Sequence, residues 1–170
     1  RLKALGEMFA HVQTYAAANP ADYDGTAAQY EKVREAAAGT KFLLMAEEEI
    51  RRLGQAKAAA VKTLTESLTT QAAEAVKAGD PARGTKLLRS YAGPLAAETA
   101  TAREAAAVRI EQEAAARQQA AARQAETAAT RLAELYGGVT DALLKGDTAA
   151  AGRLVTAAKT TPELAGKQDE

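Results

Sequence analysis

The chain has 170 residues, of which 46 are alanine and only 27 are Leu, Ile, Val or Phe. Lysine and arginine together number 22, as do aspartate and glutamate, so the formal net charge is zero. This balance argues against a dedicated nucleic-acid-binding protein, and the lack of cysteine excludes disulfide frameworks, thiol catalysis and the common zinc fingers. Because alanine is the strongest helix former, and no apolar run approaches ~18 residues, the composition predicts an all-α protein without a membrane-spanning segment.

Glycine and proline divide the chain at regular points, and apolar residues recur at spacings of three and four between these points. This spacing places the apolar side chains on one face of each helix. The end of the chain, residues 162–170, is predicted to be frayed or to begin a further element. The predicted helices cover about residues 2–18, 21–38, 41–78, 81–91, 94–145 and 148–159.

The residues at these points predict how each helix ends and how the next begins. Glycine adopts the left-handed conformation that ends helices, Asn, Asp and Thr side chains accept hydrogen bonds from free N–H groups, and proline fits the first helical position. The expected helix ends are Gly39, Gly79, Gly93 and Gly146. The expected capping residues are Asn19, Thr40, Asp80 and Asp147. The expected first-position prolines are Pro20, Pro81 and Pro94.

Two of the predicted helices are unusually long. The third would span ~38 residues, or ~57 Å at 1.5 Å per residue, with Gly54 inside it as a point of weakness or close contact. The fifth would span ~50 residues, or ~75 Å, if it continues through Gly137–Gly138. The sequence leaves that continuity open.

A repeat is visible in residues 18–30, 78–88 and 145–155, each of which reads as a helix end, a short turn and a short amphipathic helix. Each long helix supplies the first helix of the next hairpin, so the chain is expected to be an elongated helical repeat of short hairpins joined by long, coiled-coil-like helices. The predicted divisions are 1–78, which holds a hairpin and the first long helix, 79–145, which holds a short helix and an alanine-rich long helix, and 146–170, which holds a short helix and the end of the chain.

The first repeat resembles a known family. Residues 22–33, the Ala38-Gly39-Thr40 turn and residues 46–53 are similar to a tetratricopeptide-like helix pair of the kind found in bacterial envelope lipoproteins. The resemblance is clearest over residues 8–53. The turn lacks the proline of that family, and the long helices depart from it. The resemblance implies a non-catalytic scaffold for protein–protein contact.

An alanine-rich stretch fills residues 103–136, where large apolar residues are scarce. Paired small or apolar residues recur there every seven residues, which keeps one face of a helix toward a partner. Three interpretations are open: a solvated helix lying along a neighbour, a self-association seam between copies, and an amphipathic lipid-binding helix. The pairs are Ala107-Val108, Ala114-Ala115, Ala121-Ala122, Ala128-Ala129 and Leu135-Tyr136.

Residues that carry chemistry are few. His11 is the one histidine, and neither Ser67 nor Ser90 lies in a nucleophile motif, so we expect no catalytic triad and assign His11 a structural, partly exposed role. A metal site needs several convergent ligands, and the chain offers one histidine and no cysteine, so we expect no metal site. Asp22 and Asp24 are too few for a calcium loop, and no glycine-rich phosphate loop is present.

The acidic run 47–49 is expected to be a solvated, self-paired face, with Glu47 pairing with Arg51 and Glu48 with Arg52 at a spacing of four. The tyrosines are expected to pack at the helix joints, with the alternative that one or two mark a partner surface. They are Tyr15, Tyr23, Tyr30, Tyr91 and Tyr136.

The sequence therefore predicts a protein that is not an enzyme, with no catalytic, cofactor-binding or metal-binding residues and no small-molecule substrate. The preferred function is a helical-repeat scaffold or spacer mediating protein–protein interaction within a larger bacterial protein or complex. A self-assembling subunit, forming a dimer, bundle or fibre through the alanine seam, is the alternative. An accessory subunit docked on an envelope enzyme complex is a further one. The expected partners are proteins or other copies of the chain, and the resemblance favours the bacterial envelope over the cytoplasm.

Overall fold

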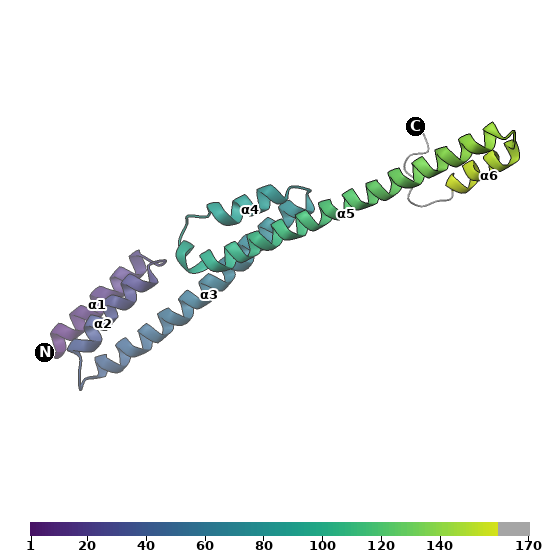
Figure 1. The fold of residues 1–170 in the computed structure, drawn as a ribbon. Helices are drawn as coiled ribbons and strands as arrows, with labels where there is room; N and C mark the ends of the chain where they lie inside the picture. Colours follow the sequence, from purple (N-terminus) through teal and green to yellow (C-terminus); the bar gives the residue numbers. More distant parts are fainter. Residues whose placement is uncertain (160–170) are drawn as a thin grey trace. The chain divides into compact units, whose positions relative to one another are not determined.

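The computed structural model describes residues 1–159, and these residues form six α-helices and no strand (Figure 1). This confirms the all-α prediction, including two long helices of 37 and 49 residues. Among the described residues, none of the helices is long and apolar enough to cross a membrane. The expectation for residues 162–170 lies outside the described part of the chain. The helices are α1 (Leu2–Ala18), α2 (Tyr23–Ala36), α3 (Lys41–Lys77), α4 (Pro81–Ser90), α5 (Ala96–Leu144) and α6 (Thr148–Lys159).

The helix boundaries follow the glycine and proline points closely, with three shifts of two residues. Helix α2 begins at Tyr23 and α5 at Ala96, each two residues later than predicted, and α2 ends at Ala36, two residues earlier. Helix α5 continues without a break through Gly137–Gly138, which answers the question that the sequence left open. Helix α3 likewise runs through Gly54. An isolated glycine weakens a helix by only about 1 kcal/mol, so a long helix tolerates it.

Three helices begin at an aspartate whose carboxylate accepts a backbone N–H three residues on. Asp22 caps α2, Asp80 caps α4 and Asp147 caps α6, at N–O distances of 2.9, 2.8 and 2.8 Å. The prediction that Asn19 caps the second helix is wrong, because its side-chain amide instead donates to the Tyr15 carbonyl at the end of α1. Thr40 precedes α3, but its hydroxyl donates backwards to the Ala37 carbonyl at 2.7 Å and makes no cap.

The glycine assignments are confirmed at three of four positions, whereas the proline assignments are confirmed only at Pro81. Gly39, Gly79 and Gly146 have positive φ angles of 73°, 87° and 75°. In the turn before α5, the positive φ of 59° belongs to Leu95 and not to Gly93. Of the three prolines, Pro81 begins its helix, whereas Pro20 and Pro94 lie in the turns before α2 and α5.

The described chain divides into two compact units, residues 1–110 and the residues from 111 onward. In the first unit, the α1–α2 hairpin packs on the first half of α3. The rings of Phe9 and Tyr30 lie 5.3 Å apart and Phe42 lies 6.1 Å from Phe9, which forms the centre of this core. Val12, Val33 and Ala46 fill the space around the rings. The bulky residues of the first repeat thus serve as its packing units.

A second core of the same unit joins the end of α3, helix α4 and the start of α5. Leu88 and Ala107 have no exposed surface there, and Leu68 and Ala72 are buried beside them. Helix α4 approaches α3 closely through Gly84: a Cβ atom at this position would lie 2.9 Å from the Ala72 carbonyl oxygen. A larger residue would therefore force the two helices apart.

The second unit contains the rest of α5 and helix α6, joined by a turn at Gly146-Asp147. The turn places Leu154 of α6 against Gly138 of α5, where an added Cβ would lie 3.3 Å from the Leu154 Cδ1 atom. Ala142 and Ala151 are buried, with exposed fractions of 9 % and 6 %. The two helices therefore form a hairpin, and α6 is the last helix of the described chain (Figure 1).

Between the second core and this hairpin, residues 111–127 of α5 form a segment that we call the bare segment. Every residue in it is exposed except Ala114, which is half-buried. The alanines of the predicted seam therefore differ in burial. Ala107 lies in the second core, whereas Ala121 and Ala122 face solvent in the described chain.

Candidate functional site

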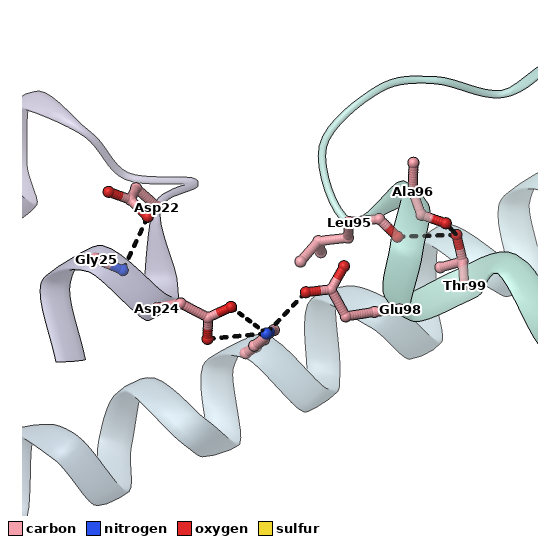
Figure 2. Close-up of polar contacts among 8 residues, drawn as sticks. Asp22, Asp24, Gly25, Leu95, Ala96, Glu98 and Thr99 are labelled. Carbon is pink, nitrogen blue, oxygen red and sulfur yellow. Dashed lines mark hydrogen bonds and ion pairs between the residues drawn. The ribbon is translucent and has the colours of Figure 1, made fainter. Parts of the chain in front are cut away.

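A three-helix ion cluster lies at the middle of α3. The Lys57 ammonium group donates to both carboxylate oxygens of Asp24 on α2, at 2.6 and 2.8 Å, and lies 2.8 Å from a carboxylate oxygen of Glu98 on α5. Figure 2 shows the carboxylates of Asp24 and Glu98 on either side of this ammonium group. The Lys57 side chain is 24 % exposed, Glu98 31 % and Asp24 74 %. The cluster thus joins the α1–α2 hairpin to the start of α5 through α3.

The charges in this cluster stabilise one another. Hydrogen bonds to Asp24 and Glu98 raise the pKa of Lys57. The hydrogen bond from Lys57 lowers the pKa of Glu98. Both shifts favour the ionised forms, as expected for opposite charges within hydrogen-bond reach. The cluster holds the three helices together, because the Lys57 ammonium group donates to the carboxylates of Asp24 and Glu98.

A buried cation, Arg103, lies in the second core with an exposed fraction of only 7 %. Its guanidinium donates to the carbonyl oxygens of Leu88 and Ala96 and to the Thr99 hydroxyl, and it lies 5.3 Å from the centre of the Tyr91 ring. These groups satisfy the donors of a charge that would otherwise be costly to bury. Arg103 therefore fastens the end of α4 and the turn that follows it to α5.

An open groove of about 320 Å³ lies between α1 and α2. His11 lines it and is exposed, whereas the sequence predicted a partly exposed residue; its structural role stays a prediction. The other lining residues are three apolar side chains, one glutamine and one lysine, so the groove is partly apolar and carries one cationic side chain besides His11. They are Met8, Val12, Gln29, Lys32 and Val33.

The residues of a hypothetical Ser–His–Asp site are placed apart along the fold. His11 adjoins Val12 of the first core, whereas Ser67 adjoins Leu68 of the second core. Ser90 ends α4. The Ser67 hydroxyl accepts a hydrogen bond from Gln71 at 3.2 Å, which is a contact within one helix. Among the described residues, no group of three or more His, Cys, Asp or Glu side chains could hold a metal ion.

The acidic run on α3 forms ion pairs along its own helix, but with a different register from the predicted one. Glu48 pairs with Arg51 and Glu49 with Arg52, at a spacing of three residues. The two pairs expected at a spacing of four, Glu47 with Arg51 and Glu48 with Arg52, are therefore not the ones formed. Both spacings bring side chains to neighbouring places on a helix, so rotamer choice decides between them.

A second groove, of about 470 Å³, runs along α3 and is lined by that helix alone. Its threonine hydroxyls are already used within the helix: Thr65 donates to the Val61 carbonyl and Thr69 to the Thr65 carbonyl, both at 2.8 Å. Glu74 and Lys77 pair with each other at 2.7 Å. The polar groups of this surface therefore support the helix.

The tyrosines divide between packing and the surface. Tyr30 is 3 % exposed in the first core, and Tyr91 is half-buried against Arg103. Tyr15 joins the end of α1 to the start of α2 by a 2.5 Å hydrogen bond to Asp22. This bond raises the pKa of Tyr15 and lowers that of Asp22. Tyr136 is 61 % exposed and is therefore not a packing residue within its hairpin.

Sequence reasoning missed the joining roles of Lys57 and Arg103, although each residue leaves a trace in the sequence. Lys57 follows Leu53 by four residues, so it lies on the apolar stripe of its helix. Arg103 precedes Ala107 by four residues, so it lies beside the alanine seam. A charged residue on an apolar stripe is the signal that would have identified both.

Comparisons with known proteins do not assign the chain to a family. The chain matches no family model, no curated protein and no solved structure.

Proposed function

We propose that this chain is a non-catalytic helical-repeat scaffold, or spacer, that mediates contact between proteins within a larger assembly. The observation that supports the proposal most strongly is the bare segment of residues 111–127. Its helix has almost no buried side chain, whereas well-packed cores occur where helices join. A spacer needs a helix that continues beyond a packed joint without a covering partner, and the 49-residue helix α5 contains such a segment.

The interactions of the charged residues agree with this function. Lys57 and Arg103, two cations that join different helices, use their donors on groups of the chain itself. Ion pairs along α3 do the same at the surface. These polar contacts fix the joints of a scaffold.

In-cell photo-crosslinking tests the proposal. A photoreactive residue replaces His11 in the α1–α2 groove or Gln118 in the bare segment, and the full chain is expressed in its native host. A scaffold that binds partners at its joints should give discrete adducts with other proteins from position 11 and few from position 118. The absence of protein adducts at both positions would contradict the proposal.

Self-assembly through the alanine seam is the second candidate, and the exposure of Ala121 and Ala122 favours it. Small side chains on a seven-residue repeat let two helices approach closely. Replacing Ala114 and Ala121 with glutamate should then abolish association while the helix content, measured by circular dichroism, remains. Association that survives both substitutions would exclude the seam.

A further inference from the structure

Burial changes along the single helix α5. Thr99, Arg103 and Ala107 in its first part are buried in the second core, with exposed fractions of 0, 7 and 0 %. Burial resumes at Ala128, which is 7 % exposed. The bare segment of residues 111–127 lies between them, and the boundary between the two compact units falls at its start. One continuous helix therefore belongs to two packed regions, with an unpacked stretch between them.

The bare segment depends on its own helical backbone. Its 17 residues are alanine, glutamine, glutamate, arginine and threonine, without one large apolar side chain. Most helices in proteins owe their stability to the packing of an apolar face, which this stretch lacks. Ion pairs along a helix add support, as Glu48–Arg51 and Glu49–Arg52 do on α3. Residues 118–122 carry no charge, so no ion pair supports the middle of the bare segment.

The hairpins on either side of the bare segment are held by local hydrogen bonds. Gly79-Asp80 joins α3 to α4, and Gly146-Asp147 joins α5 to α6. In both turns the glycine N–H donates to a carbonyl three residues back at 3.0 Å, and the aspartate N–H donates to a carbonyl five residues back at 2.9 Å. Each aspartate carboxylate caps the helix that follows it, at 2.8 Å. Each hairpin thus has its own turn and its own cap, and neither uses a residue of the bare segment.

The matching turns align the two hairpins at a constant offset of 67 positions, from Asp80 to Asp147. We call the α3–α4 hairpin the covered hairpin, because Ala107 of α5 packs with its Leu88, which has no exposed surface. The equivalent residue of the α5–α6 hairpin is Val155, which is 44 % exposed, and we call this hairpin the open hairpin. Since the equivalent residues differ in burial, we expect the two packed regions to open with different free energies.

We propose that the bare segment opens by local unfolding while the packed regions on both sides of it stay folded, so that α5 is one helix in structure but two units in stability. The parts of a protein that open first have few buried contacts and many exposed backbone hydrogen bonds. The bare segment has both properties, and its alanines resist opening only through their helix propensity. While it is open, a change in one packed region cannot pass along the helix to the other.

Opening changes what the bare segment does as a spacer. As a helix its 17 residues span ~26 Å, whereas the same residues fully extended reach ~58 Å. The closed segment is a stiff rod, and the open segment is a flexible linker. In the scaffold proposed above, this gives a spacer that can lengthen under load. The opening itself does not depend on the scaffold function, because it is measured on the isolated chain.

Hydrogen–deuterium exchange of the full chain, in dilute solution and resolved along α5, tests the proposal. After correction for intrinsic rates, amides of residues 113–125 should exchange at least about 100-fold faster than those of residues 99–107. Residues 139–151 should also be better protected than the bare segment. Uniform protection along α5 would overturn the proposal, because it would mean that the helix opens only as a whole.

A proline substitution separates local opening from global opening. Ala121→Pro breaks the helix inside the bare segment, because proline removes a backbone donor and its ring clashes with the preceding turn. The protection of residues 99–107 should then change by less than about twofold. Ala107→Pro makes the same change within the second core and is the matched control, which should remove the protection of α4. Protection of residues 99–107 that is lost in Ala121→Pro would contradict the proposal.

An added ion pair tests what holds the segment closed. Gln119→Glu places a carboxylate four residues before Arg123, which is the favourable order, and should slow exchange in the bare segment about twofold. Gln124→Glu adds the same charge with no cation three or four residues away, and should leave the exchange rate unchanged. Equal exchange in the two variants would show that contacts other than the helix itself hold the segment, which would contradict the proposal.

Discussion

The turns at Gly79-Asp80 and Gly146-Asp147 are alike in φ sign, backbone hydrogen bonds and capping aspartate. The hairpins that they produce differ in what lies over them. Helix α5 closes the first, and Leu88 is completely buried; the described chain places no helix after the second, and Val155 remains 44 % exposed. Local chemistry therefore makes the hairpin, and a third helix makes the core.

The same contrast explains the two halves of α5. Its first turns carry Thr99, Arg103 and Ala107 into the second core, where all three are buried. The bare segment that follows is equally alanine-rich but buries almost nothing. Small side chains remove little apolar surface from water, so they stabilise a contact only where larger partners such as Leu68 and Leu88 surround them.

The largest expected effect comes from shortening the equivalent residues of the two hairpins. Leu88→Ala should lower the free energy of unfolding by about 2–5 kcal/mol, because it leaves a cavity in a closed core. Val155→Ala should cost no more than about 0.5–1 kcal/mol in dilute solution. Urea denaturation followed by circular dichroism measures both. Similar losses at the two positions would mean that the α5–α6 hairpin is as well covered as the α3–α4 hairpin.

Arg103→Met tests the buried cation that closes the first of these hairpins. The substitution keeps an apolar stem but removes the guanidinium donors to the carbonyls of Leu88 and Ala96, which should cost about 1–3 kcal/mol. Hydrogen exchange should show faster opening of α4 than in the wild type. Arg117→Met, at an exposed position further along the same helix, is the control. An unchanged exchange rate in α4 would show that packing alone holds the turn.

Capping substitutions sharpen the comparison further. Asp80→Ala and Asp147→Ala remove the same hydrogen bond, and each should cost about 0.5–2 kcal/mol. In the covered hairpin, the loss should lower the stability of the whole second core. In the open hairpin, it should appear as local fraying of α6 in hydrogen exchange. A global effect from Asp147→Ala would be inconsistent with an open hairpin.

The smallest effect concerns the ion cluster around Lys57, and pH should reveal it. Because Lys57 lowers the folded-state pKa of Glu98, this contribution to stability is present above the unfolded-state pKa and is lost as pH falls through the folded-state pKa. Glu98→Gln should therefore lower the melting temperature at pH 7 but make no difference at about pH 2. Glu66→Gln on α3 is the control. A difference between wild type and Glu98→Gln that persists in acid would exclude the charge interaction as its cause.

The raised pKa of Lys57 determines how the stability of the fold changes at alkaline pH. Its contribution is complete below the unfolded-state pKa and is lost as pH rises through the folded-state pKa. The cluster should therefore stabilise the fold across the neutral range and weaken at both extremes.

Much of the secondary structure could be predicted from the sequence. Gly79-Asp80 and Gly146-Asp147 are each a helix stop followed directly by a helix start. These local signals placed the starts of α4 and α6 correctly and the ends of α3 and α5 to within one residue. The prediction was wrong at Asn19 because two side chains compete nearby, and Asp22 has the shorter reach to the N–H of Gly25. Local sequence rules identify the residues that could cap a helix, but they do not decide which of them accepts the hydrogen bond.

Which alanines are buried could not be predicted in the same way. Ala107 and Ala121 occupy the same place in the seven-residue repeat, yet one lies in a core and the other faces solvent. Alanine forms a helix through its own backbone, whatever surrounds it, so the sequence by itself determined six helices and their turns. Burial of an alanine depends on which other helix packs against its side chain. The joining roles of Arg103 and Lys57 depend on partners that lie on other helices, 15 positions away for Leu88 and 41 positions away for Glu98. Only the tertiary structure decides those, because it alone brings distant residues within a few ångströms.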